Sequence, residues 1–245
     1  MSLDSLPNYE KELHEIVLNT LKQHYKQQTG ENLNNETLQK LNLTVTKNGK
    51  TYPTNALLLL SDDDLRLLRF PHGKIECACF KGTERLDFIS QKSVYCSLSQ
   101  QSNQAYNYIL KHIKKGSTHQ NIFDEERWEY PMIAIQEIIH NGVIHRDYSL
   151  ERVDIKIVIF ADRIEIITPG SLSPTVDYDD PNTIQAAYRN TSLLPIFKKL
   201  GLIEQAGNGL KTIDNDLKNY PEIDYQWKET EYGLWFCFKK KEHKS

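Results

Sequence analysis

The sequence predicts an α+β protein with two parts: a mixed α/β module over residues 1–120 and an α/β sandwich over residues 121–245. A polar stretch at 116–131 separates two differently patterned halves, which places the boundary. The second half shows a helix, two strands, a loop, two helices and two strands, and its strands alternate β-branched residues. This order favours a sheet with helices on one face.

Composition excludes several classes of protein. Of the 245 residues, 39% are hydrophobic and 26% charged, which is typical of a soluble globular chain. No apolar run approaches the ~20 residues of a membrane span, and the N-terminus lacks a signal-peptide pattern, so we expect a cytoplasmic protein with no membrane partner. A net charge of -3 and small basic clusters favour DNA contact only indirectly or through a module outside this chain.

The four cysteines are expected to be buried packing residues in a reducing compartment rather than a zinc site. Cys77 and Cys79 share one face of a strand, but their spacing differs from the C-x-x-C pairs of zinc sites.

In the first half, apolar spacing predicts helices at 9–28, 37–43 and 98–115. The Asn-Gly turn in "TKNGKTYPT" predicts a hairpin. "NALLLLS" at 55–61 and "KIECACFKGT" at 74–83 are interpreted as strands, and "SDDDLRLL" at 61–68 as an N-capped turn or short helix.

In the second half, Pro131 opens a long helix, because proline is favoured in a first turn. "DIKIVIF" and "RIEIIT" predict a hairpin, and the Pro- and Gly-rich segment at 169–182 predicts a loop. Helices follow at 192–202 and 208–220. The strands "DYQWKE" and "GLWFCFKK" close the chain.

The helix after Pro131 carries a polar stripe, because Glu137, Asn141 and His145 are each four positions apart. An amide oxygen suits a Mg²⁺ that also holds phosphate oxygens, and a carboxylate can activate a water. The alternative is a solvent-facing pair on an amphipathic helix. His145-Arg146-Asp147-Tyr148 is expected to end the helix and brace the next strand, and Gly142 is expected to permit close approach of a neighbour.

A second candidate feature is the G-x-G at Gly207 and Gly209, placed where a loop enters a helix. Free N–H groups at a helix N-terminus favour an anion, and glycine lets it come close. An ordinary loop-to-helix entry would give the same pattern.

Most of residues 130–238 resembles a known family. "YPMIAIQEIIHNGVIHRDY", "DRIEIITPGSL" and "YRNTSLLPIFKKLGLIEQAGNGLKTI" are similar, in order and spacing, to the C-terminal domain of RecG-like helicase-related proteins and transcriptional regulators. "GKTYPTNALLLLS" and "IECACFKGTE" resemble the region that follows a Schlafen AlbA-type module in such proteins. The core of that module is missing, so we expect a fragment or a short family member.

The resemblance implies a Bergerat-like fold of the GHKL superfamily, to which gyrase and histidine kinases belong. It implies Glu137 as a general base and Asn141 as both a cofactor-binding residue and the Mg²⁺ ligand. It also implies cofactor contacts from the following residues: Thr168, Gly170, Arg189, Asn190, Gly207, Asn208 and Gly209. Thr168 stands where the superfamily has the Asp that binds adenine, which removes a charge-assisted contact.

The resemblance thus implies a regulatory domain that binds ATP or ADP with Mg²⁺ at a degenerate site. Two alternatives remain: an active ATPase with Glu137 as base, and an interaction or homo-oligomerisation scaffold without nucleotide. A RecG-type motor would need a G-x-x-x-x-G-K-[ST] phosphate loop, which the sequence lacks, so we expect no helicase activity by that mechanism.

Overall fold

A computed structural model describes residues 2–117, 126–171, 189–203 and 209–242. Its main feature is a six-stranded mixed sheet with strand order β4-β3-β7-β8-β10-β9. Strands β3 and β7 are parallel, and the other neighbours in the sheet are antiparallel. The strands are β3 (Ile75–Phe80), β4 (Phe88–Val94), β7 (Ile155–Ile159), β8 (Arg163–Pro169), β9 (Ile223–Thr230) and β10 (Gly233–Lys240).

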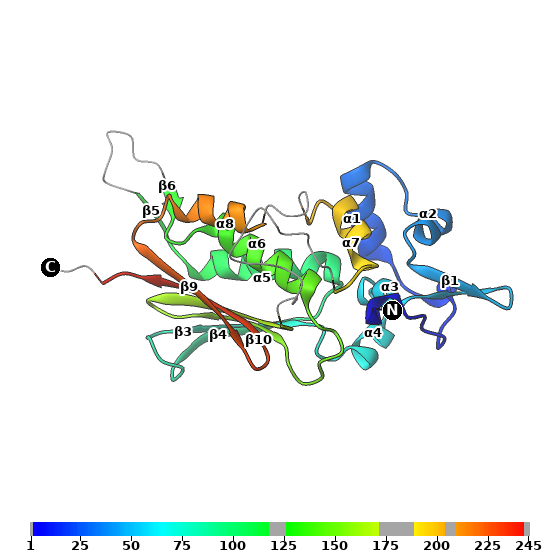
Figure 1. Cartoon of the computed structure of the whole chain (residues 1–245), viewed down its shortest axis with the longest axis horizontal. Helices are drawn as coiled ribbons and strands as arrows, with labels where there is room; N and C mark the ends of the chain where they lie inside the picture. The colour runs from blue at the N-terminus through cyan, green and yellow to red at the C-terminus, as the bar shows by residue number, and fades with distance from the viewer. Residues whose placement is uncertain (1, 118–125, 172–188, 204–208, 243–245) are drawn as a thin grey trace.

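Helices cover one face of this sheet. Figure 1 shows α5 (Leu98–His112), α6 (Met132–His145) and α8 (Gly209–Leu217) side by side above the strands. Alternate strand residues, such as Ile155, Ile157 and Ile159 in β7, point into the layer between sheet and helices and are almost fully buried. The predicted α/β sandwich is therefore confirmed.

The remaining elements gather at one end of the sheet (Figure 1). They are α1 (Asn19–Thr29), α2 (Asn35–Lys40), β1 (Thr44–Lys47), β2 (Lys50–Pro53), α3 (Asn55–Leu59), α4 (Asp64–Arg69) and α7 (Leu193–Lys199), with 3₁₀ turns at Leu3–Ser5 and Leu13–Glu15. The predicted hairpin is confirmed, with Asn48 and Gly49 at positive φ between β1 and β2. The carboxylate of Asp4 accepts hydrogen bonds from the backbone N–H groups of Ser192 (2.7 Å) and Leu193 (3.0 Å), so the N-terminal segment contacts the start of α7.

The prediction of a strand at "NALLLLS" is wrong, because residues Asn55–Leu59 form helix α3. Thr54 caps this helix, and its hydroxyl accepts a hydrogen bond from the N–H of Leu57 at 3.4 Å. All four leucines are buried, so the run has no polar face from which a helical period could be read.

Other differences concern boundaries. The helix expected from residue 9 begins at Asn19, and the helix expected to reach 115 ends at His112. Strand β4 was not predicted, because most of its side chains are exposed and lack alternation. The polar stretch at 116–131 contains part of a short ladder between β5 (Lys115–Ser117) and β6 (Glu126–Trp128). Strands from both sides of residue 120 share the six-stranded sheet.

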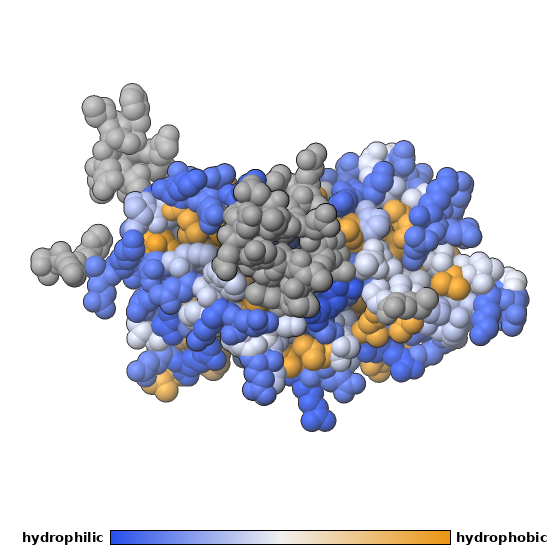
Figure 2. Space-filling model, in the orientation of Figure 1, coloured by the Kyte–Doolittle hydropathy of each residue, from blue (hydrophilic) through white to orange (hydrophobic). Residues whose placement is uncertain are grey.

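On the side of the molecule drawn in Figure 2, hydrophobic residues lie in small separate groups among hydrophilic ones. In the part of the chain that the structure describes, no helix has both the length and the apolar character to cross a membrane.

Candidate functional site

Helix α6 positions the two central candidate residues. Most of its apolar side chains are buried against the sheet and the neighbouring helices, among them Ala134, Ile135, Ile138, Ile139, Val143 and Ile144. Glu137 and Asn141 lie on another side of the helix and are half-buried. The burial of the isoleucines thus fixes the rotation of α6 and directs this pair toward α8 rather than into bulk water.

Glu137 and Asn141 are joined by a hydrogen bond. Asn141 Nδ2 donates to Glu137 Oε1 at 2.8 Å, one helical turn away. The bond uses the amide nitrogen, which leaves the amide oxygen on the side of the group that faces away from the carboxylate. An oxygen in this position has the chemistry of a Mg²⁺ ligand.

The start of α8 lies directly on this pair. A Cβ added to Gly209 would be 2.6 Å from Glu137 Oε1 and 3.2 Å from Asn141 Nδ2. Glycine at this position lets the backbone of α8 approach without displacing the end of the Glu137 side chain. Residues 137, 141 and 209, which the sequence predicted as one site, are therefore brought together. Gly207 and Asn208, also predicted to bind the cofactor, lie outside the described residues.

Thr168 and Gly170, at the end of β8, lie near the C-terminal half of α6. Thr168 is buried, and a Cβ on Gly142 would be 2.6 Å from its Cγ2 methyl. Gly142 therefore permits the close approach expected from the sequence, and the neighbour is Thr168. Gly170 has φ +115°, and its Cα lies beside Asp147 and Arg189.

Arg189 and Asn190 bind the C-terminal end of α6. Asn190 is buried, and its Nδ2 donates to the carbonyl oxygens of Ile144 (2.6 Å) and Arg146 (2.8 Å). These carbonyls belong to the last turn of the helix, where no intrahelical donor remains. Arg189 forms an ion pair with Asp147 and donates to the carbonyl of Ser171 at 3.1 Å. The structure thus places both predicted cofactor contacts as supports for this helix end.

Asp147 holds the segment after α6 in place. Its N–H donates to the carbonyl of Pro169 at 3.2 Å, which ties it to β8, whereas the sequence predicted that the His145–Tyr148 segment braces the next strand, β7. Partial burial acts to raise the pKa of this carboxyl, but hydrogen bonds from Ser149 and the charge of Arg189 outweigh burial, and the pKa is lowered. The carboxylate is therefore charged at neutral pH.

Two histidines in α6 are neutral at pH 7. Burial lowers the pKa of His140 to about 4. Burial and the charge of Arg189 lower the pKa of His145 to about 4. His145 thus continues the polar stripe of Glu137 and Asn141 without adding a positive charge to it.

The cysteines are packing residues in this fold. Burial raises the pKa of the Cys77 thiol to about 12 and of the Cys96 and Cys237 thiols to about 11. Within the described ranges, no group of three or more His, Cys, Asp or Glu side chains is arranged to hold a metal ion.

Asp216 was missed by the sequence reasoning. Its Oδ2 accepts a hydrogen bond from the N–H of Ala134 at 2.8 Å, which links α8 to the first turn of α6. Asp216 is buried on the same side of α8 as Ile213, three residues earlier. The sequence does carry one signal for a buried aspartate here, because Asp216 shares a helix face with the core residue Ile213.

Comparisons with known proteins agree with this architecture. Residues 153–238 match the family model described as "Putative ATP-dependent DNA helicase recG C-terminal", which confirms the resemblance noted in the sequence for this part of the chain. No curated protein matches the chain.

Among solved structures, the DIP2311 protein from Corynebacterium diphtheriae matches with a TM-score of 0.77 and 14% sequence identity. The match covers 98% of this chain and 48% of that protein, so this chain spans about half the length of the solved structure. At this identity the likeness shows a shared fold.

Proposed function

We propose that this chain, whose residues 153–238 match the C-terminal region of RecG-like proteins, is a nucleotide-binding regulatory domain. Its ligand would be ATP or ADP with Mg²⁺, bound in a GHKL-like manner where α8 meets α6. The observation that carries the proposal is the contact of Gly209 with the hydrogen-bonded pair Glu137 and Asn141.

Each of the three residues has a chemical role in this proposal. Asn141 would offer its amide oxygen to Mg²⁺, and its hydrogen bond to Glu137 keeps the amide in the required orientation. Gly209 is the first residue of α8, where backbone N–H groups have no intrahelical partner and favour phosphate oxygens. When bound, Mg²⁺ would neutralise charge on the phosphates.

Thr168 weakens the recognition of adenine in this proposal, which is why the site is described as degenerate. Thr168 stands where the related superfamily has an Asp, and its methyl group packs against Gly142. A hydroxyl in place of a carboxylate gives a weaker contact with an adenine amino group. Glu137 could still act as a general base, and this alternative function predicts phosphate release that Glu137→Gln abolishes.

Thermal unfolding with nucleotide tests the proposal. A ligand that binds only the folded state at 100 times its Kd stabilises it by about 2.7 kcal/mol, so we expect a clear rise in Tm with MgATP or MgADP. Asn141→Ala should reduce this rise strongly. Asn215→Ala, which removes an exposed amide from α8, is the control and should leave it unchanged. No rise at millimolar nucleotide, or an equal rise in Asn141→Ala, would contradict the proposal.

Gly209→Ala separates binding from folding. The added methyl group collides with the end of the flexible Glu137 side chain, which can rotate away, so the free energy of unfolding should change by less than about 1 kcal/mol. Rotation of Glu137 breaks its bond to Asn141, so nucleotide affinity should fall at least tenfold. Gly82→Ala is the control, because a Cβ there meets no atom within 4 Å.

A scaffold without nucleotide is the second candidate, and one observation favours it. Asn190 donates its hydrogen bonds to the end of α6, and Arg189 pairs with Asp147. These groups therefore stabilise the fold and do not point into a ligand cavity. A scaffold would show oligomerisation or partner binding that Asn141→Ala leaves unchanged. Neither function requires a helicase motor.

A further inference from the structure

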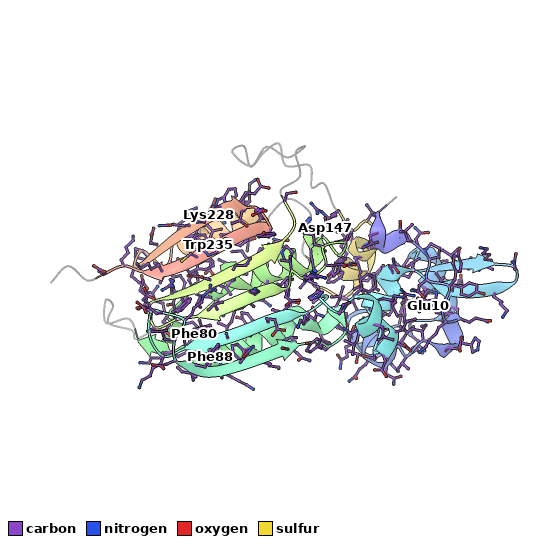
Figure 3. All side chains as sticks on the ribbon, turned by 90° about the horizontal axis from the view of Figure 1, so that it is seen from below. Glu10, Phe80, Phe88, Asp147, Lys228 and Trp235 are labelled. Carbon is purple, nitrogen blue, oxygen red and sulfur yellow. The ribbon has the colours of Figure 1, made fainter. Side chains whose placement is uncertain are left out.

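A separate pocket lies between the two halves of the chain. It has a volume of about 320 Å³, within the range of small-molecule sites. One wall is the segment 68–73 between α4 and β3, and the other is the segment from Arg146 to Arg152 that follows α6. Asp147, which lies between the lining residues Arg146 and Tyr148 in the chain, marks this region in Figure 3, where the sheet meets the N-terminal elements.

Arg146 contributes a buried positive charge to this pocket. Arg146 is only 2% exposed, and its Nη2 donates a hydrogen bond to the carbonyl of Val153 at 2.7 Å. Among the described residues, Nε and Nη1 find no hydrogen-bond acceptor. Buried guanidinium groups are normally paired with an anion or fully hydrogen-bonded, because an unsatisfied buried donor is costly. Arg146 lines the pocket, and its incompletely satisfied positive charge favours an anionic ligand there.

Further cations line the same pocket. Arg69 reaches it from α4, and Arg152 reaches it from the opposite wall. Arg69 also pairs with Glu10, whereas His72 pairs with Asp154 at 3.0 Å. Glu151 is the acid among the lining residues. The lining residues include three arginines and one glutamate, and the carboxylates of Glu10, Asp147 and Asp154 lie close to these arginines and offset part of their charge.

The pocket also has an apolar side. Phe70 and Tyr148 meet edge to face with ring centroids 6.5 Å apart, and the guanidinium of Arg146 lies 5.4 Å from the centre of the Tyr148 ring. Leu68 lines the pocket and is 77% exposed, so its apolar surface is available to a ligand. A suitable ligand therefore has a charged end and an aromatic or aliphatic body.

We propose that this pocket binds a small organic phosphate, with Arg146, Arg152 and Arg69 around the phosphate and the apolar side against its organic part. A phosphate monoester carries nearly two charges and three acceptor oxygens, which suits several guanidinium groups better than a single carboxylate does. The site lies beyond the C-terminal end of α6, whereas Glu137 and Asn141 lie in its middle. It does not rest on the proposed nucleotide site.

Titration calorimetry with phenyl phosphate, and with benzoate for comparison, tests this site. We expect saturable binding of phenyl phosphate and binding of benzoate that is at least tenfold weaker. Arg69→Ala and Arg152→Ala should each reduce the affinity for phenyl phosphate at least tenfold. Both variants leave the buried Arg146 in place, so we expect both proteins to fold.

Arg85→Ala is the matched control. The Arg85 side chain is 55% exposed and pairs with Glu165, much as the Arg69 side chain is 53% exposed and pairs with Glu10. This control and Asn141→Ala should bind phenyl phosphate as the unchanged protein does. The proposal is overturned by absence of saturable binding, by equal affinity for benzoate, or by unchanged affinity in Arg69→Ala and Arg152→Ala. Loss of phenyl phosphate binding in Asn141→Ala would show that the phosphate binds at the α6–α8 junction, and this result would also overturn the proposal.

Discussion

Asp216 in α8 accepts a hydrogen bond from the backbone N–H of Ala134 in the first turn of α6, with Oδ2 and N 2.8 Å apart. The contact places a carboxylate at the positive end of the α6 dipole and satisfies a donor that has no intrahelical acceptor. At the other end of α8, the backbone of Gly209 lies beside the side chains of Glu137 and Asn141. Asp216 thus fixes one helix of the candidate site relative to the other.

Asp216→Ala should lower the free energy of unfolding by about 1–2 kcal/mol, as the loss of a helix cap does. Urea unfolding measures this change. Asp214→Ala removes an exposed carboxylate from the same helix and serves as the control. If both variants lose the same stability, the hydrogen bond to Ala134 has no special role.

Gly142→Ala should destabilise the fold although alanine is the better helix former. The new methyl would lie 2.6 Å from Thr168 Cγ2, and relief of such a contact costs typically about 1–3 kcal/mol against a gain of about 1 kcal/mol in helix propensity. Thr168→Ser removes the methyl that collides, so the double variant should recover much of the loss. A double-mutant cycle by urea unfolding checks this, and additive changes would show that the two residues do not interact.

Asn190→Ala should cost about 1–3 kcal/mol, because it leaves the buried carbonyl groups of Ile144 and Arg146 without their donor. Guanidinium unfolding gives the value, with Asn215→Ala as an exposed control. Nucleotide titration of the same variant shows whether Asn190 also touches a ligand. Full stability in Asn190→Ala would argue against its role at the helix end.

Stability should fall as the pH is lowered from about 6.5 to about 4. The pKa of His140 and of His145 is lowered from 6.5 to about 4 in the folded protein. Between these values the unfolded chain binds more protons than the folded chain, so unfolding becomes easier as the pH falls. Each histidine contributes a slope on the order of 1 kcal/mol per pH unit.

Urea unfolding at several pH values between about 4.5 and 7 measures this change, because the expected loss of stability falls within that range. His140→Gln should reduce the dependence on pH, because one buried titrating group is removed. His14→Gln is the control, since the His14 side chain is 76% exposed. An unchanged slope in His140→Gln would mean that folding does not lower the pKa of His140.

Periodicity in the sequence predicted the elements that have one wet and one buried side. The helix with Glu137 and Asn141 has such a pattern, whereas the β7–β8 hairpin is mostly buried on both sides and was predicted from its β-branched residues. The sequence of helix α3 predicts a strand, because all its leucines are apolar and buried and no helical period can be read from them. Strand β4 was missed because most of its side chains are exposed.

Spacing along one helix predicted part of the candidate site, since it placed Glu137 beside Asn141. The contact with Gly209 came from the resemblance to a known family and is now seen as a distance. Asn190, Asp216 and Arg146 act through partners far away in the chain or through burial. No local pattern encodes those partners, which is why their roles became visible only in three dimensions.

The parallel pairing of β3 with β7 affects when the chain can fold during its synthesis. Ile75 lies beside Ile155 in the sheet, and the residues between them form β4, α5 and α6. During synthesis β3 therefore emerges long before the strand that completes its hydrogen bonding, and its closure depends on contacts distant in sequence. The sheet strands of the first half cannot complete their pairing before β7 is made. The protein therefore acquires its stable form only after the β7–β8 hairpin has been synthesised.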